Sequence, residues 1–115
     1  MDLTLKKCVP CEQGVGRLDA EGAAAAARQL DGWSLRAGAT RLHKHFRFVD
    51  FVAAMRFVNA MAEVAEQEGH HPDFTVHYAD VDVTLWTHAV AGLSENDFIL
   101  AAKLDARTES RGVRH

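Results

Sequence analysis

Apolar residues recur at helical spacing in the middle of the chain, from residue 51 to about residue 68. Asp50 precedes this stretch and is a suitable N-cap. One apolar stripe, which we expect to pack across a sheet, comprises Phe51, Met55, Val58, Met61 or Ala62, and Ala65. A second stripe comprises Val52, Phe57, Ala60 and Val64. This second stripe contacts either the other helices of the same chain or a second subunit.

Two shorter helices are predicted on either side of this long one. The first is an alanine-rich run, residues 20–30, with Asp19 as its cap and a break at residues 31–32. The other begins after residues 94–97, which resemble a capping box with Asp in the usual Glu position, and continues to about Leu104.

Alternation of apolar and polar residues predicts four strands in two hairpins. The first hairpin joins residues 33–35 to residues 41–48 through a turn near Gly38. The second joins residues 74–78 to residues 81–86 through a tight turn at Ala79–Asp80. Each strand pair is therefore expected to be antiparallel.

One face of the second strand collects Arg41, His43, His45 and Arg47. This face is either a ligand or partner surface or simply the solvated side of an antiparallel sheet. Lys44 is the exception to the alternation, because it falls on the apolar side.

The order of elements is helix, two strands, helix, two strands, helix. It predicts an α+β fold in which a four-stranded antiparallel sheet has three helices packed on one face. Residues 18–108 form a single domain in this interpretation, preceded by an irregular arm, residues 1–17, and followed by a frayed tail, residues 109–115.

Composition narrows the functional classes. The 115-residue chain has a formal net charge of -3, whereas nucleic-acid binders normally carry a basic excess. Arg56, Asn59 and Glu63 interrupt the longest helix, and the amino terminus lacks a signal-peptide pattern. We therefore expect a soluble, cytoplasmic protein that binds neither nucleic acid directly nor membranes.

Cys8 and Cys11 are the two cysteines of the chain, and their C-x-x-C spacing precedes any predicted helix or strand. Such a pair is half of a zinc site or a redox motif without its usual setting. The favoured interpretation is a mobile, reduced arm, with redox or metal binding as alternatives.

The unusual chemistry of the chain lies in residues 66–88, which contain four of the seven histidines. A helix that finishes at Gly69 would place His70 and His71 at its carboxyl end, where the helix dipole favours an imidazolium. Pro72 prevents the helix from continuing. His70 and His71 should therefore mark a loop at the edge of the sheet.

His88 follows the last predicted strand and can meet His70 and His71 at the same edge of the sheet. The three rings could act as proton donors and acceptors, since histidine titrates near neutrality. They could instead bind a metal together with Glu66, although two adjacent histidines rarely converge on one ion. A third possibility is that all three are structural or surface residues.

The spacing of these residues resembles that of the pterin-4a-carbinolamine dehydratase family. The motif residues are Glu66, His70, His71, Pro72, Tyr78, His88 and Asp97. Further matches are Gly32–Trp33 and the segments 46–51 and 87–94. The resemblance covers nearly all of residues 19–105, and the fold of that family coincides with the element order predicted above.

The resemblance implies dehydration of a 4a-hydroxytetrahydropterin to quinonoid dihydropterin and water, which recycles the pterin of aromatic amino-acid hydroxylases. By similarity His70 and His88 transfer protons, with acid and base unassigned. His71 holds the pterin and Glu66 orients His70. No metal or other cofactor is implied, and a homodimer or homotetramer is expected.

Further members of the substrate site implied by the resemblance are Gly69, Trp86, Thr87 and Ala89. Trp86 is bulkier than the small hydroxylated residue of many relatives, and Val90 replaces a cysteine of the animal enzymes. Asp97 opens a helix, so a capping role is expected for it.

The aromatic residues Trp33 and Tyr78 are expected in the core or the pocket wall. An alternative function also follows from the family, in which animal relatives bind a homeodomain transcription factor and degenerate relatives assist Rubisco assembly. Retention of Glu66 and of all three histidines favours the enzyme.

Overall fold

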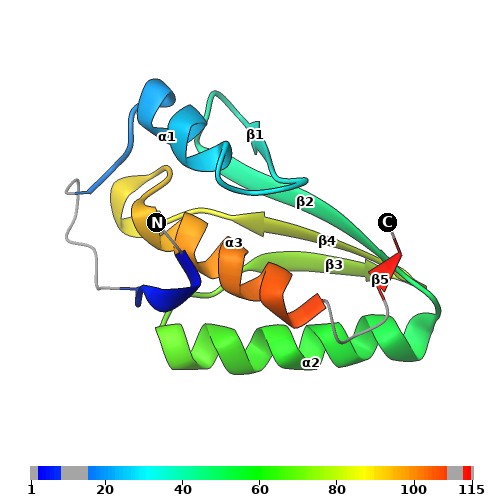
Figure 1. Ribbon diagram of the computed structural model, residues 1–115. Helices are drawn as coiled ribbons and strands as arrows, with labels where there is room; N and C mark the ends of the chain where they lie inside the picture. Colours follow the sequence, from blue (N-terminus) through cyan, green and yellow to red (C-terminus); the bar gives the residue numbers. More distant parts are fainter. Residues whose placement is uncertain (1–2, 9–15, 109–112, 115) are drawn as a thin grey trace.

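The computed structural model describes residues 3–8, 16–108 and 113–114 (Figure 1). Its helices are α1 (Ala20–Ala27), α2 (Phe51–Glu68) and α3 (Glu95–Thr108), with short 3-10 turns η1 (Leu3–Leu5) and η2 (His88–Val90). Its strands are β1 (Ser34–Arg36), β2 (Arg41–Phe48), β3 (Asp73–His77), β4 (Asp80–Leu85) and β5 (Val113–Arg114). The order of the main elements matches the sequence prediction, and the structure is an α+β fold.

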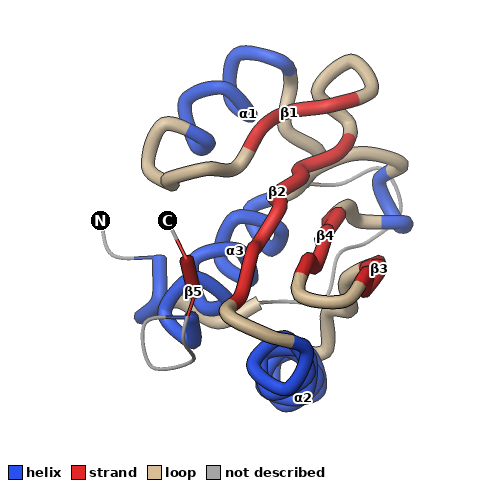
Figure 2. Tube along the Cα trace, turned by 90° about the vertical axis from the view of Figure 1, so that its right-hand side faces the viewer, coloured by secondary structure: helices blue, strands red, loops and turns tan. Residues whose placement is uncertain are grey.

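The sheet has the strand order β1-β2-β4-β3, and every pairing is antiparallel. The predicted four-stranded sheet is confirmed. A two-residue addition, β5, pairs with the end of β2 although it lies in the tail that was expected to fray. Figures 1 and 2 show the three helices on one side of the sheet, with α3 between α1 and α2.

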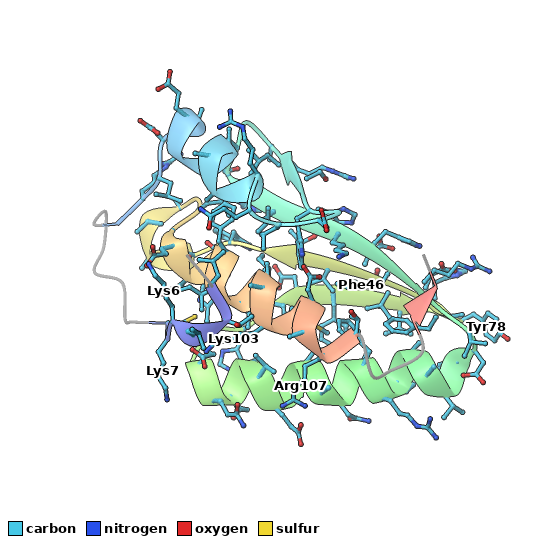
Figure 3. All side chains as sticks on the ribbon, in the orientation of Figure 1. Lys6, Lys7, Phe46, Tyr78, Lys103 and Arg107 are labelled. Atoms are coloured by element: carbon cyan, nitrogen blue, oxygen red, sulfur yellow. The ribbon has the colours of Figure 1, made fainter. Side chains whose placement is uncertain are left out.

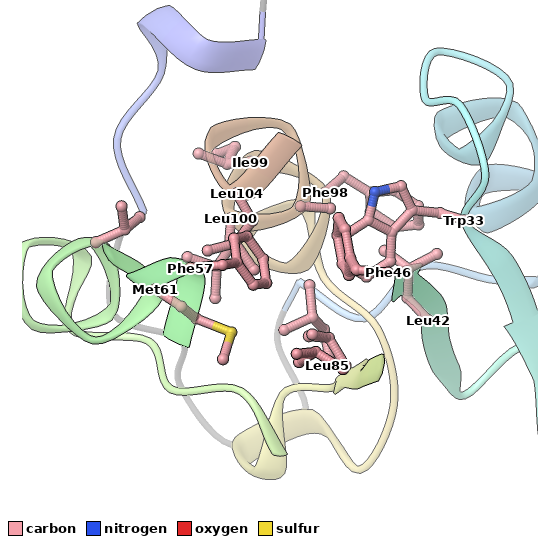
Figure 4. Close-up of a cluster of buried hydrophobic side chains, with 14 of the residues drawn as sticks. Trp33, Leu42, Phe46, Phe57, Met61, Leu85, Phe98, Ile99, Leu100 and Leu104 are labelled. Carbon is pink, nitrogen blue, oxygen red and sulfur yellow. The ribbon is translucent and has the colours of Figure 1, made fainter. Parts of the chain in front are cut away.

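The core lies between α2, α3 and the inner face of β2 and β4. Aromatic rings dominate it: Phe57 of α2 lies 4.6 Å from Phe46 and 5.2 Å from Phe48, centroid to centroid. Figure 4 shows Phe98 and Leu100 of α3 in the same cluster. Burial of these large side chains is the main force that fixes the helices on the sheet.

The face of α2 that packs on the core differs from the expected one. The buried residues are Ala53, Ala54, Phe57, Ala60, Met61, Val64 and Ala65. Phe51 and Val52 are 49% and 56% exposed. Most of the second apolar stripe thus faces the core, while the beginning of the first stripe faces outward. Because α2 has apolar residues on both sides of its axis, periodicity alone could not choose between them.

Lys44, the exception in the alternation of β2, lies beside the core and donates hydrogen bonds to two acceptors. Its ammonium group donates to Asp105 at 2.8 Å and to the Asp31 carbonyl at 2.9 Å. Trp33, buried as expected, also donates to Asp105, at 2.9 Å. Burial raises the pKa of Asp105 despite these hydrogen bonds. Lys44 therefore satisfies a carboxylate that would otherwise be partly buried without a cation.

Tyr78 was expected in the core or pocket wall, and this prediction is wrong. It occupies the turn between β3 and β4 with a φ of 55° and is 65% exposed. The hairpin turn is Tyr78–Ala79, one residue earlier than predicted, so the aromatic ring points away from the sheet. Figure 3 shows Tyr78 at one end of the molecule, far from Lys6.

The outer face of the sheet carries charged pairs between β2 and β4. His45 contacts Asp82 at 3.0 Å and Asp80 at 2.8 Å, and His43 contacts Asp82 at 3.1 Å. Arg47 pairs with Asp80 at 3.3 Å. These are cross-strand neighbours in the register of β2 and β4, so this face has the charged, half-exposed character of a solvated sheet surface.

The two caps of α2 determine where the helix begins and ends. The Asp50 carboxylate accepts a hydrogen bond from the Ala53 amide at 2.8 Å. Gly69 adopts a left-handed conformation, with φ of 65° and ψ of 28°, and turns the chain out of the helix. Within the described residues, no helix is long and apolar enough to cross a membrane.

We predict that replacing Gly69 with alanine lowers the free energy of unfolding by about 1 kcal/mol, because a Cβ disfavours the left-handed conformation. Steric crowding is not the cause, since apart from the glycine and its chain neighbours no atom lies within 4 Å of the Cβ position. Gly69→Asn should cost less, because asparagine tolerates this conformation. Urea denaturation compares the variants, and an alanine variant as stable as wild type would contradict the argument.

We also predict that His45 stabilises the fold in a limited pH range. The Asp82 hydrogen bond, with a contribution from Asp80, raises the pKa of His45 above 6.5. Burial opposes ionisation of Asp82, but the hydrogen bonds from His45 and His43 outweigh it and lower the pKa of Asp82 below 3.8. The contacts between His45 and the aspartates therefore stabilise the fold fully between the ordinary pKa values of the two groups, 3.8 and 6.5. This stabilisation is lost as the pH rises through the raised histidine pKa, or falls through the lowered aspartate pKa.

His45→Gln should reduce the free energy of unfolding by about 0.5 kcal/mol at about pH 5.5, and by less at about pH 9, since the pair is half-exposed. Urea denaturation at both pH values measures the difference. An equal effect at the two pH values would show that the ion pairs make no contribution.

Candidate functional site

A cavity of about 490 Å³ lies where the end of α2 meets the end of β4 and the turn η2. Its lining comprises Cys8, Glu68, Gly69, His70, His71, Pro72, Asp73, Trp86, Thr87, His88, Ala89 and Asn96. The structure therefore gathers the three histidines singled out in the sequence around one space. Every residue expected to bind the substrate also lines it, whereas Glu66 does not.

His70 is the most firmly held of the three histidines. Its Nε2 atom lies 2.6 Å from Oδ1 of Asp97, and only 12% of its side chain is exposed. The amide of His70 donates to the Ala65 carbonyl at 3.2 Å, which closes the carboxyl end of α2. Both the backbone and the ring of His70 are thus fixed by hydrogen bonds.

Asp97 is fully buried and joins three groups. Its Oδ2 atom accepts hydrogen bonds from the Thr87 hydroxyl at 2.8 Å and from the Ser94 amide at 3.0 Å. The second contact is the reciprocal half of a capping box, so the expected capping role of Asp97 is confirmed. The first α3 turn therefore uses one carboxylate both to cap the helix and to hold His70.

Glu66 contacts a different histidine from the one expected. Its Oε2 atom lies 2.6 Å from Nε2 of His71, and both side chains are exposed. The expectation that Glu66 orients His70 is wrong, because the left-handed turn at Gly69 takes both histidines out of the helix. The four-residue spacing of an α-helix no longer applies beyond that turn.

His88 is exposed and stacks against Trp86, with ring centroids 3.6 Å apart and an interplanar angle of 37°. The guanidinium of Arg41 lies over the indole of Trp86, 3.7 Å from the ring centroid. The indole Nε1 donates to Asp73 at 3.1 Å. Trp86 therefore has a cation and an imidazole against its rings and a carboxylate at its edge. Val90, the second position at which the sequence departs from the expected family pattern, is buried and does not line the cavity.

Four residues of the cavity were missed in the sequence: Cys8, Glu68, Asp73 and Asn96. The Cys8 amide donates to Glu68 at 2.8 Å, and the Cys8 thiol contacts the Asn96 carbonyl at 3.5 Å. The amino-terminal arm has no periodic pattern from which this docking could be predicted. Cys11 lies outside the described residues, so the expectation about the cysteine pair stays a prediction.

The described residues contain no group of three or more histidine, cysteine, aspartate or glutamate side chains arranged to hold a metal ion. The side chains around the cavity provide imidazole rings with carboxylate and hydroxyl partners. Two imidazoles on different elements, with His70 fixed by a buried carboxylate, are suited to donating and accepting protons on a flat ligand.

Comparison with known proteins identifies relatives over most of the chain. The sequence profile of the family described as pterin 4 alpha carbinolamine dehydratase matches residues 16–107. A protein of Halorhodospira halophila is 47% identical over 92% of this chain and 97% of its own length. A protein of Nitrosomonas eutropha is 49% identical over 90% of this chain and 91% of its own length. The names of both assign them provisionally as pterin-4-alpha-carbinolamine dehydratases.

Solved structures agree with this assignment. A transcriptional coactivator/pterin dehydratase from Brucella melitensis has a TM-score of 0.75 and 39% identity, covering 78% of this chain and 96% of that one. A pterin dehydratase-like protein identified as a Rubisco assembly factor in the alpha-carboxysome has a TM-score of 0.60 and 26% identity. The match covers 69% of this chain and 92% of that one. By sequence match and by fold, the chain belongs to the pterin-4a-carbinolamine dehydratase family.

Proposed function

We propose that this protein dehydrates a 4a-hydroxytetrahydropterin to quinonoid dihydropterin and water, and so recycles the pterin cofactor of aromatic amino-acid hydroxylases. The observation that carries the proposal is the convergence of His70, His71 and His88 on one cavity, with His70 held by buried Asp97. Family membership supports the same activity.

The reaction needs two proton transfers and no electron transfer. The hydroxyl on C4a must receive a proton in order to leave as water, and N5 must lose its proton as the new double bond forms. One acid and one base on different parts of a flat ring are sufficient. The reaction therefore balances without a metal or a redox cofactor.

The contacts of His70 favour the role of base. Oδ2 of Asp97 accepts two hydrogen bonds, and an ionised Asp97 would also accept one at Oδ1 from Nε2 of His70. A neutral His70 ring then carries its lone pair on Nδ1. We assign this atom to removal of the N5 proton, and His88 to protonation of the departing hydroxyl.

His71 and Glu66 serve substrate binding in this proposal. The Glu66 carboxylate lies 2.6 Å from Nε2 of His71 and restricts the exposed ring at the mouth of the cavity. Gly69, Thr87 and Ala89 line the remaining wall, where their small size leaves room for the pterin.

Trp86 has a more specific role than lining the substrate site. The ring of His88 and the guanidinium of Arg41 both lie against its indole, so much of the ring surface is already in contact with protein groups. We propose that Trp86 is a positioning residue that orients His88, held in turn by Asp73 at 3.1 Å.

Self-association as a homodimer or homotetramer is the second part of the proposal. Phe51, Val52 and Phe74 are about half-exposed, and an apolar groove of about 300 Å³ lies between α2 and the edge strand β3. Exposed apolar surface next to an edge strand is typical of contacts between copies. Glu66 and His71 also line this groove, so the contact would adjoin the site.

A binding or assembly role is the alternative, since one solved relative is described as a transcriptional coactivator/pterin dehydratase and another as a Rubisco assembly factor. The complete set of cavity histidines favours the enzyme, because a protein that only binds a partner has no need of a fixed base and a second exposed imidazole around one cavity.

We predict that His70→Ala and His88→Ala each slow dehydration by about two to four orders of magnitude, the usual loss when a general acid or base is removed. The assay follows quinonoid dihydropterin from freshly generated 4a-hydroxytetrahydropterin. His77→Ala is the matched control, since His77 is exposed on β3 outside the cavity. Wild-type turnover in both cavity variants would contradict the assignment.

We predict that Trp86→Ser lowers kcat by roughly 10- to 100-fold with a smaller change in KM, because misplacing a proton-transfer group reduces rate more than binding. Trp86→Phe should recover part of kcat, since a phenyl ring can still stack on His88. An increase in KM at unchanged kcat would instead show that Trp86 acts by contacting the substrate.

A further inference from the structure

The amino-terminal arm, residues 3–8, is docked against the end of the molecule that holds the cavity. Leu3 is buried among the core residues, and Lys6 pairs with Glu95 at the start of α3 at 2.9 Å. Figure 3 shows Lys6 and Lys103 of α3 at the same end of the molecule. The arm continues to Cys8, which lines the cavity together with the three histidines.

We propose that this arm forms one wall of the pterin cavity and increases substrate affinity, with Glu68 as the residue that anchors it. The inference rests on the dehydratase function proposed above and adds a substrate-binding segment to it. The family profile matches residues 16–107, so residues 3–8 precede the matched region.

Glu68 provides the anchor through both of its carboxylate oxygens. Oε1 accepts from the Cys8 amide at 2.8 Å, and Oε2 accepts from the Lys103 ammonium at 2.7 Å. Only 6% of the Glu68 side chain is exposed. Burial opposes its ionisation, but the hydrogen bonds from Lys103 and Cys8 outweigh burial and lower the pKa of Glu68. A buried carboxylate with two donors fixes the arm more firmly than an exposed ion pair.

Cys8 contributes a small neutral surface to this wall. Burial, together with the nearby Glu68 carboxylate, raises the pKa of Cys8 to about 12, so the thiol is protonated at neutral pH. A protonated thiol is a poor nucleophile and a poor metal ligand. It behaves as a small apolar group, which suits contact with a flat heterocycle.

The kinetic test compares Glu68→Gln with Lys6→Ala. Glutamine has the size of glutamate, but its neutral amide oxygen accepts a weaker hydrogen bond from the Cys8 amide, and its side chain cannot pair with Lys103 as an anion, so the arm should be held less firmly. Lys6→Ala removes an ion pair whose Glu95 side chain is 60% exposed, and it should have little effect. We expect Glu68→Gln to raise KM, and the dissociation constant of biopterin measured by calorimetry, by about 3- to 10-fold, with kcat within about twofold.

A second measurement does not depend on a variant of Glu68. In a Cys11→Ser protein, Cys8 is the remaining thiol, and its modification by excess N-ethylmaleimide, slow because little of the thiol is ionised, can be timed by mass spectrometry over hours. Saturating biopterin should slow this modification several-fold, because the ligand would cover Cys8.

The outcomes separate the two proposals. Unchanged KM and biopterin affinity in Glu68→Gln, or equal modification of Cys8 with and without bound biopterin, would overturn the wall while leaving the dehydratase intact. A wild-type protein that neither turns over the hydroxypterin nor binds biopterin would overturn the proposed function itself.

Discussion

The hydrogen bond between His70 and the buried carboxylate of Asp97 joins the end of α2 to the start of α3, and the arrangement of the cavity depends on it. Two backbone features make this contact possible. Gly69 turns the chain out of α2 in a left-handed conformation, and the capping box at Ser94 places Asp97 in the first turn of α3. Since both helices are fixed on the sheet by the Phe57 and Phe98 cluster, the contact is held by the core.

This arrangement separates the histidines into a fixed one and two exposed ones. His70 is held by a carboxylate that itself has two other donors. His71 and His88 are exposed, and each is restrained by one neighbouring group, Glu66 or Trp86. In the proposed reaction, His70 would be the fixed base and His88 the exposed acid for a ligand that exchanges protons at two positions.

Much of this structure could be predicted from the sequence, and the failures have specific causes. Strong periodicity and clear caps gave β2 and α2 their bounds, and the break after Gly69 indicated where the histidines would gather. The partners of those histidines could not be predicted, because the Asp97 contact spans 27 residues and depends on how α3 packs.

Other errors arise where the local pattern is ambiguous. The long helix is apolar on both sides, so the sequence did not identify its buried face, and Phe51 proved exposed. The hairpin turn came one residue early, which moved Tyr78 from a strand to the surface. The docking of Cys8 on Glu68 involves a segment without any period, and only the folded structure brings the two together.

The most direct test of the account is the rate at which freshly generated 4a-hydroxytetrahydropterin loses water in the presence of the wild-type protein, followed as quinonoid dihydropterin with and without a chelator. The account predicts a rate that rises in proportion to protein concentration and is the same with the chelator present. A rate equal to the spontaneous one, or an acceleration that the chelator abolishes, would contradict catalysis by the cavity histidines.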